Sequence, residues 1–95
     1  MKLRVGVVGL GDAWENRHRP ALRALADRFE VIAVCAEVQS LAQRAAEDFD
    51  AVAVEGVRAL TSRDDVDAVL MLAPEWYGPL PILAACEQGK AIYCA

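Results

Sequence analysis

Apolar runs alternate with amphipathic segments along the whole chain, and this alternation limits the fold more than any other feature of the sequence. Short runs rich in apolar and β-branched residues are typical of strands buried on both faces of a parallel sheet. Five runs have this character: Leu3–Val8, Glu30–Ala36, Ala51–Val54, Val66–Leu72 and Ala91–Cys94. The order β-α-β-α-β-α-β-α-β with short connections predicts right-handed crossovers and helices on both faces. We therefore predict an α/β domain with a doubly wound, five-stranded parallel sheet.

In the segments between these runs, apolar residues recur at helical spacing. A second helix is expected over Val38–Phe49, and about two further helical turns over Val57–Ser62. The first helix is expected after Pro20, with its apolar stripe at Leu22, Leu25, Ala26 and Phe29.

The last helix is expected to open at Gly78-Pro79, because proline is tolerated in the first turn of a helix. Gly89 is expected to end it in the left-handed conformation. We predict that its apolar side consists of Ile82, Leu83, Ala85 and Cys86.

The composition indicates one folded domain and excludes several functional classes. The chain has 95 residues, of which 56% are hydrophobic and 25% charged, as in a folded globular protein. The formal charge is −4 and no basic cluster interleaves with aromatic residues, so no nucleic-acid partner is expected. No segment reaches the ~20 apolar residues of a membrane span, and the N-terminus lacks a signal-peptide cleavage site. We therefore expect a cytoplasmic protein without a membrane segment.

The three cysteines, Cys35, Cys86 and Cys94, all lie in apolar runs. An odd number of cysteines in such runs predicts buried, reduced thiols. No C-x-x-C pair or histidine–cysteine cluster indicates a metal site, since the single histidine, His18, lies in a different segment.

A glycine pair follows the first predicted strand, in the stretch VGLGDAWENRH. Gly9 and Gly11 have the spacing of a dinucleotide-binding turn, but Trp14 stands where that pattern has its third glycine. In the binding interpretation, Gly9 permits the turn, and Gly11 lets the backbone approach a pyrophosphate at the N-terminus of the following helix. The alternative is a plain structural turn. Trp14 predicts a longer loop before a later helix, with the indole packed under the turn or lying over the cofactor.

An acidic residue near the end of the second strand is the next element of a dinucleotide site. Glu37 is the candidate ligand for the ribose 2′-hydroxyl of NAD, and the alternative is a solvated surface glutamate. The residue directly after Cys35, where an aspartate is most often found, is Ala36. No arginine or lysine lies nearby to hold a 2′-phosphate, which favours NAD over NADP.

Several segments, in their order and spacing, resemble one known family. They are VGVVGLG, HRPAL, FEVIAVC, the alanine-rich helix that ends at Phe49, DVDAV, the turn after Leu72, and GKAIYC. Together they are similar to the N-terminal cofactor domain of the Gfo/Idh/MocA oxidoreductases. The resemblance implies a Rossmann-like NAD(P)-binding domain over residues 1–95, incomplete at its C-terminal end. It also implies hydride transfer to or from a sugar, inositol or related polyol in a longer protein. The catalytic lysine and the substrate domain would lie beyond Cys94, so we assign no catalytic residue.

The sequence departs from the family at three places. Trp14 replaces a small residue, and the segment up to His18 is one residue longer than the common pattern. Ala36 replaces an acid, and the family's T-P-x-x-x-H turn has Ala73 and Gly78 in place of the threonine and the histidine. The resemblance implies NAD as the cofactor, with NADP as the alternative. The candidate cofactor-binding residues are Gly9, Leu10, Gly11, Asp12, Ala13, Trp14, Ala36, Glu37, Ala73, Pro74 and Trp76.

Other residues that could carry chemistry have structural alternatives. Trp76 and Tyr77 either pack on the following helix or lie beside the nicotinamide ring. His18 is either a general base or, because the sequence places no carboxylate to orient it, a structural histidine near a helix start. The acidic residues before the fourth strand are expected to form a solvated turn and not a metal cluster, because the strand that follows separates their side chains. They are Asp64, Asp65 and Asp67.

Two functions from different classes follow from these patterns. The first is the cofactor-binding portion of an NAD(P)-dependent oxidoreductase, inactive as an isolated chain. The alternative is a non-catalytic Rossmann-type module that senses a nucleotide or mediates association. In either case we expect self-association as a homo-oligomer, because the last predicted strand is an apolar sheet edge.

Overall fold

The structure is a computed structural model of the chain and describes residues 2–72 and 77–94. Within these residues the chain forms a five-stranded sheet in the order β3-β2-β1-β4-β5, and every neighbouring pair is parallel. The doubly wound α/β prediction is therefore confirmed, with strand ends that differ from the predicted ones by at most two residues. The strands are β1 (Leu3–Val8), β2 (Phe29–Cys35), β3 (Val52–Ala53), β4 (Ala68–Met71) and β5 (Ala91–Cys94).

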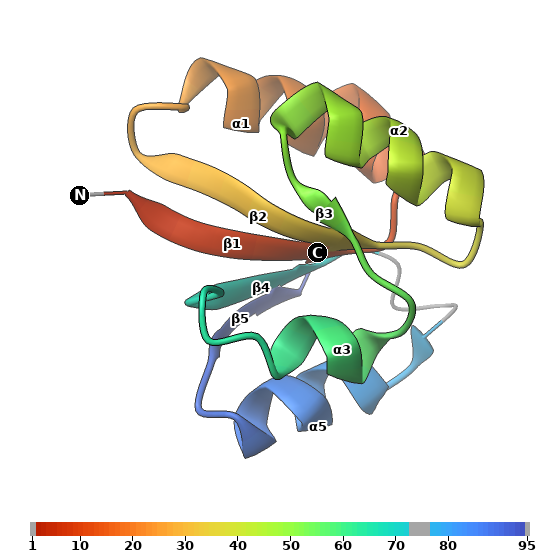
Figure 1. The fold of residues 1–95 in the computed structure, drawn as a ribbon, viewed down its shortest axis with the longest axis vertical. Helices are drawn as coiled ribbons and strands as arrows, with labels where there is room; N and C mark the ends of the chain where they lie inside the picture. Colours follow the sequence, from red (N-terminus) through yellow and green to blue (C-terminus); the bar gives the residue numbers. More distant parts are fainter. Residues whose placement is uncertain (1, 73–76, 95) are drawn as a thin grey trace.

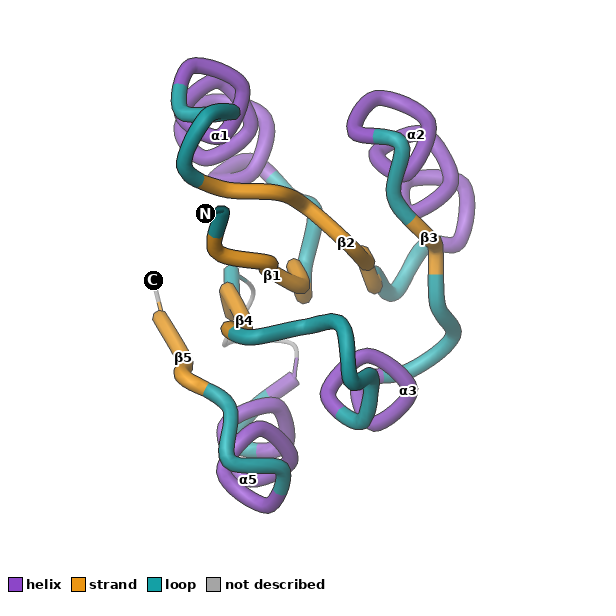
Figure 2. The backbone as a smooth tube through the Cα atoms, turned by 60° about the vertical axis from the view of Figure 1, so that its left-hand side comes forward, coloured by secondary structure: helices purple, strands orange, loops and turns teal. Residues whose placement is uncertain are grey.

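Helices cover both faces of the sheet (Figures 1 and 2). α1 (Arg19–Ala24) and α2 (Gln39–Phe49) lie on one face, and α3 (Val57–Thr61) and α5 (Leu80–Glu87) lie on the other. Parallel neighbours need such crossovers, because the chain must return to the same end of the sheet before the next strand begins. Among the described residues, no helix combines the length and apolarity needed to cross a membrane.

Each face of the sheet has its own apolar core, which explains the continuous apolar runs of the central strands. Val5 and Val7 of β1 pack with Trp14 and the alanines of α2 on one face. Val8 packs with Leu60 of α3 on the other face. Because successive side chains of a strand point to opposite faces, a central parallel strand has no polar side.

The first helical segment begins earlier than predicted and contains a π-helical turn. Helical backbone starts at Asp12, and Trp14–His18 form a π-helical turn (η1) that continues into α1. The N–H of Arg19 donates to the carbonyl of Trp14, five residues back. The prediction of a longer loop was therefore wrong. A π-helical turn accommodates an extra residue within a helix, so the chain takes up the additional length there.

Phe29 begins β2, whereas the helical pattern had placed it on the first helix. α1 ends at Ala24, and the N–H groups of Arg28 and Phe29 donate to the carbonyl of Leu25 at 2.8 and 3.0 Å. Phe29 nevertheless packs against the core beneath α1 and α2, now from the strand. The spacing identified a core side chain but assigned it to the wrong element.

The buried side of α5 also differs from the prediction. Apart from Glu87 at its end, the helix consists of apolar residues on all sides, so the sequence pattern could not select the side that faces the sheet. Leu83 is 56% exposed, and Ile82 and Cys86 are exposed with it. The buried residues are Pro81, Ala84 and Ala85.

The cysteines divide into one buried and two exposed thiols. Cys35 is buried, as predicted, but the prediction was wrong for Cys86 and Cys94. Cys86 lies on the outward side of α5, and Cys94 lies on β5, which has a sheet neighbour on only one side in the described chain. All three thiols are free.

Candidate functional site

The strand order reverses between β1 and β4, and this reversal locates the candidate site (Figure 2). From β1 the chain proceeds to β2 and β3 on one side, and from β4 it proceeds to β5 on the other. In doubly wound sheets, ligands bind in the crevice outside the carboxyl ends of the strands at such a reversal. The segments that follow β1, β2 and β4 are therefore the ones that could contact a ligand.

Gly9 turns the chain away from the end of β1 and fixes the turn to β2. Its φ is 93°, a conformation that residues with a side chain rarely adopt. Its N–H donates to the carbonyl of Cys35, the last residue of β2, at 2.9 Å. Leu10 points into the core beneath α1 and α2 and is 4% exposed. The turn is thus fixed to both the sheet and the core.

Gly11 is exposed, and the chain itself does not require glycine there. A Cβ at Gly11 would meet no atom within 4 Å, and its φ lies outside the left-handed region. The space in front of its backbone is open. Such space is what the close approach of a pyrophosphate to the backbone requires.

The helical backbone starts directly after this glycine. The N–H of Glu15 donates to the carbonyl of Gly11 at 3.1 Å, and both Asp12 and Ala13 are exposed. The first N–H groups of a helix have no acceptor within the helix and carry partial positive charge. The glycine turn and the helix start together fit the pyrophosphate of a dinucleotide.

Trp14, the misfit residue of the glycine pattern, has a buried indole. Its side chain is 1% exposed, and its ring centroid lies 5.5 Å from that of Phe49 at an interplanar angle of 57°. Of the two placements expected for the indole, packing beneath the turn is the observed one. The ring joins η1 to α2 and offers no surface to a ligand.

Ala36 and Glu37 follow β2 at the same edge of the sheet. Ala36 is half-buried against the core beneath α1 and α2, and Glu37 is exposed. None of the ion pairs formed by residues 2–72 and 77–94 includes Glu37. Its carboxylate is therefore available at the position where dinucleotide sites hold a ribose hydroxyl.

The segment after β4 is described only from Tyr77 onward, and the candidates Ala73, Pro74 and Trp76 lie outside the described residues. Tyr77 packs against the core that contains Ala84 and Ala85 of α5, in line with the packing alternative.

Tyr77 also makes a contact that sequence reasoning missed. Its hydroxyl lies 3.9 Å from Sγ of Cys35. Burial, followed by the contact with Cys35 and the nearby Glu37 carboxylate, raises the pKa of Tyr77 above its ordinary value. No local pattern could have revealed this contact, because the two residues belong to different elements and meet only in the folded sheet.

His18 lies at the end of η1 and lines an apolar cavity of about 430 Å³ between α1 and the strands β1, β4 and β5. Its ring is edge-on to that of Tyr93, with centroids 6.1 Å apart. Its Nε2 atom is buried without a hydrogen-bond partner among the described residues. A general base needs a partner that orients the ring, so this environment favours the structural alternative for His18.

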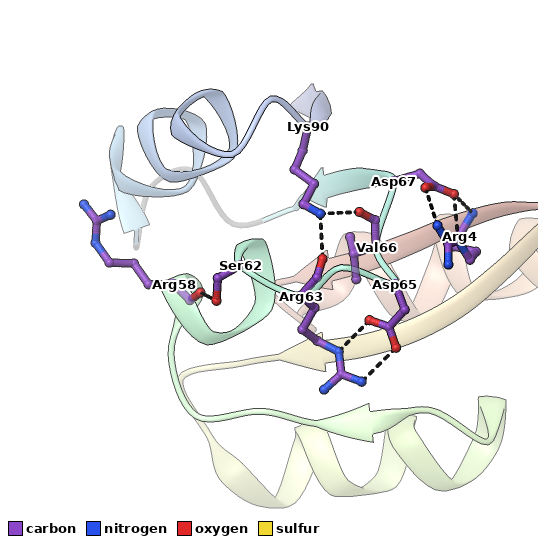
Figure 3. Close-up of polar contacts among 8 residues, drawn as sticks. All are labelled: Arg4, Arg58, Ser62, Arg63, Asp65, Val66, Asp67 and Lys90. Atoms are coloured by element: carbon purple, nitrogen blue, oxygen red, sulfur yellow. Dashed lines mark hydrogen bonds and ion pairs between the residues drawn. The ribbon is translucent and has the colours of Figure 1, made fainter.

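The acidic residues before β4 are wholly or partly exposed to solvent, as predicted, and two of them also form ion pairs that the sequence analysis did not predict (Figure 3). Asp67 accepts hydrogen bonds from Nε and Nη2 of Arg4 at 3.0 and 2.9 Å, and from the Arg4 N–H at 3.1 Å. These bonds lower the pKa of Asp67 to about 2. Asp65 accepts two bonds from Arg63, each 2.9 Å long. Asp64 is exposed and takes part in none of the ion pairs formed by the described residues.

This charged network occupies the end of the sheet opposite to the glycine turn. Arg4 lies near the start of β1, and Asp67 directly precedes β4. Nζ of Lys90, just before β5, donates to the carbonyls of Arg63 and Val66, each at 2.6 Å (Figure 3). In the described chain, no group of three or more histidine, cysteine, aspartate or glutamate residues could hold a metal ion. These charges therefore support the fold at the amino ends of the strands.

The doubly wound sheet, the glycine turn fixed to β2 and the open helix start define a Rossmann-type nucleotide-binding domain. The sequence matches the Gfo/Idh/MocA family, described as an oxidoreductase family with an NAD-binding Rossmann fold, over residues 3–95. The chain therefore belongs to the Gfo/Idh/MocA family and corresponds to its NAD-binding domain.

Relatives with assigned activities act on sugars and inositols. The dTDP-3,4-didehydro-2,6-dideoxy-alpha-D-glucose 3-reductase of Actinomadura kijaniata is 41% identical over 85 residues, which cover 90% of this chain and 23% of that protein. The inositol 2-dehydrogenase/D-chiro-inositol 3-dehydrogenase of Shouchella clausii is 34% identical over 99 residues, which cover 99% of this chain and 28% of that protein. The chain thus spans about a quarter of the length of these relatives.

A solved structure supports the same assignment. The crystal structure of KijD10, a 3-ketoreductase from Actinomadura kijaniata in complex with NADP, matches this chain with a TM-score of 0.87 and 37% identity. The match covers 99% of this chain and 30% of KijD10. The similarity therefore extends over the entire sheet described above.

Proposed function

We propose that the chain binds a nicotinamide dinucleotide and forms the cofactor-binding portion of an oxidoreductase. The observation that carries this proposal is Gly11. The position is exposed, its φ is outside the left-handed region, and a Cβ would meet no atom within 4 Å. The fold of the chain does not itself require glycine at position 11, whereas the close approach of a pyrophosphate to the backbone would require it.

Different residues of the chain would hold different parts of the cofactor. The backbone of Gly9, Leu10 and Gly11 and the exposed helix start at Asp12 and Ala13 would hold the pyrophosphate. Ala73, Pro74 and Trp76, which follow β4 in the sequence, stay predicted cofactor-binding residues. The nicotinamide ring, when bound, supplies a hydride donor or acceptor.

Glu37 supports NAD as the preferred cofactor. An exposed carboxylate at the end of β2 can accept hydrogen bonds from the 2′-hydroxyl of NAD but repels the 2′-phosphate of NADP. KijD10 was crystallised with NADP, so the family accommodates that cofactor as well. We therefore propose NAD, with NADP as the alternative.

In a longer protein, this domain would serve hydride transfer to or from a sugar, an inositol or a related polyol. The names of the two relatives above, a sugar 3-reductase and an inositol dehydrogenase, support this substrate class. The chain alone is expected to bind the dinucleotide weakly and to turn over no substrate. We further propose a cytoplasmic location, which the three free thiols support.

Calorimetric titration of NADH and of NADPH into the 95-residue chain tests the binding claim. We expect heat of binding with NADH and a smaller response with NADPH. A sample that is folded by circular dichroism and gives no heat with either compound would overturn the proposal.

A non-catalytic module that senses a nucleotide is the competing function, and Gly78 in place of the family's histidine favours it. ADP-ribose separates the two, because it shares every group of NADH except the nicotinamide. Tighter binding of NADH than of ADP-ribose supports the oxidoreductase portion, since the nicotinamide then contributes to affinity. Equal binding supports the sensing module.

A further inference from the structure

The contact between Tyr77 and Cys35 joins the two sides of the candidate site. Cys35 is the last residue of β2, whereas Tyr77 lies between β4 and α5. In the sheet, β1 separates β2 from β4. The Tyr77 hydroxyl, 3.9 Å from Sγ of Cys35, therefore connects chain segments that lie on either side of the end of β1. That end is where the glycine turn begins.

Cys35 is held from two directions. Its carbonyl accepts the N–H of Gly9 at 2.9 Å, and its thiol contacts the Tyr77 hydroxyl. The side chain is 2% exposed and packs in the core on the α3 and α5 face. Cys35 thereby links the glycine turn, the end of β2 and the segment before α5. The next two residues along the chain are Ala36 and Glu37.

The charges around this contact fit a neutral tyrosine hydroxyl. Burial, Cys35 and the Glu37 carboxylate all raise the pKa of Tyr77, so the hydroxyl keeps its proton at neutral pH. Glu37 follows Cys35 by two residues along the chain, so its backbone lies at the same end of β2 as the contact between the Tyr77 hydroxyl and the Cys35 thiol.

We propose that Tyr77 is a positioning residue of the cofactor site, which acts through Cys35 to place Glu37 for the ribose. By holding the end of β2 against the glycine turn, it sets the discrimination between a ribose 2′-hydroxyl and a 2′-phosphate. This inference rests on the proposed function.

Tyr77→Phe tests the inference, because it removes the hydroxyl and keeps the ring. The readout is the ratio of the NADPH to the NADH dissociation constant, measured by calorimetry on the complete chain. We expect this ratio to fall about threefold, the effect of losing one modest hydrogen bond. A purely structural role would weaken both dinucleotides equally and leave the ratio unchanged. Tyr93→Phe, the same change at an exposed tyrosine on β5, is the control and should match the parent.

Cys35→Ala removes the same contact from the other side and should lower the ratio in the same direction. It also replaces Tyr77→Phe if that variant does not fold. A folded variant with the parent's ratio would overturn the inference while the proposed function stands. A folded parent that binds neither dinucleotide would overturn the proposed function, and the inference with it.

Discussion

Gly9 and Gly11 are glycines for different reasons, and substitution by alanine should separate these reasons. Alanine at Gly9 must adopt a φ near 93°, which costs about 1–2 kcal/mol of stability. Alanine at Gly11 meets no atom within 4 Å, so the free energy of unfolding should change by at most about 0.5 kcal/mol. NADH affinity of Gly11→Ala should nevertheless fall by at least about tenfold, equivalent to about 1.4 kcal/mol. Urea unfolding and calorimetry of both variants measure the two effects.

The comparison between these two variants is the control. If Gly11→Ala loses as much stability as Gly9→Ala, the fold itself requires glycine at position 11. Gly11 then no longer supports a pyrophosphate site. Undiminished NADH binding by a folded Gly11→Ala protein would be equally damaging.

Asp67 should make the stability of the chain depend on pH in the acid range. Its hydrogen bonds to Arg4 lower its pKa in the folded chain from 3.8 to about 2. The unfolded chain therefore binds this proton more readily than the folded chain. The stabilisation is present above about pH 4 and is lost as the pH falls to about 2.

Asp67→Asn should accordingly be less stable than the parent at pH 7 and approach the parent's stability as the pH falls from about 4 to about 2. Urea unfolding at a series of pH values gives the difference directly. Asp64→Asn changes an exposed neighbour and should leave the parent's pH dependence intact. A stability difference between parent and Asp67→Asn that stays constant down to pH 2 would refute the assignment.

At the scale of elements, the sequence patterns predicted helices and strands correctly where apolar positions are clearly distinguished from neighbouring polar ones. The strands and α2 show such contrast with their surroundings, and all were predicted to within two residues. α5 has no polar side, so its buried face was decided by the small side chains Ala84 and Ala85, which the pattern did not indicate. Phe29 satisfied the helical spacing and was predicted on the first helix, but the turn at Leu25 ends the helix earlier and Phe29 begins β2.

The π-helical turn was beyond prediction because its cause is tertiary. Burial of Trp14 against Phe49 and burial of Leu22 must both be satisfied by one continuous helical segment. An extra residue between them is taken up most easily as a local widening of the helix. The sequence indicated the additional residue but not whether a loop or a helix would contain it.

Deletion of Asn16, which is exposed within η1, should convert the π-helical turn into regular helix. Trp14 and Leu22 would remain on the buried side, so the free energy of unfolding should stay within about 1 kcal/mol of the parent's. Insertion of an alanine after Asn16 is the matched control. A second additional residue rotates the buried Leu22 by about 100° relative to Trp14 and should cost about 2 kcal/mol or more. Equal losses from the deletion and the insertion, measured by urea unfolding, would show that η1 does not absorb an extra residue.

At the scale of the whole molecule, the sequence located half of the candidate site. Gly9, Gly11 and Glu37 could be placed at strand ends, because parallel strands bring their carboxyl ends to one edge. Which segments meet at that edge depends on the order β3-β2-β1-β4-β5, which local patterns do not encode. The contact of Tyr77 with Cys35 therefore required the folded sheet.

β5, an outer strand of the sheet, is where the chain is expected to associate with itself. In the described chain β5 has a neighbour on one side only, and its residues Ala91–Cys94 carry no charge. Lys90 cannot protect this edge, because its Nζ is engaged by the carbonyls of Arg63 and Val66. Open apolar edges pair readily with other strands, and natural proteins commonly guard them with lysine. Tyr93, 55% exposed beside the apolar cavity under α1, adds apolar surface there.

We therefore predict a concentration-dependent homo-oligomer that Tyr93→Lys converts toward monomer, because a charge on the edge opposes strand pairing. Leu83→Lys is the matched control, since Leu83 is 56% exposed but lies on α5, away from the edge. Light scattering over a range of concentrations compares the parent with both variants. If both variants reduce association equally, general apolar exposure rather than the β5 edge drives it. A parent that stays monomeric at high concentration would contradict the prediction. The free backbone N–H and C=O groups of β5 would then be insufficient to hold two copies together.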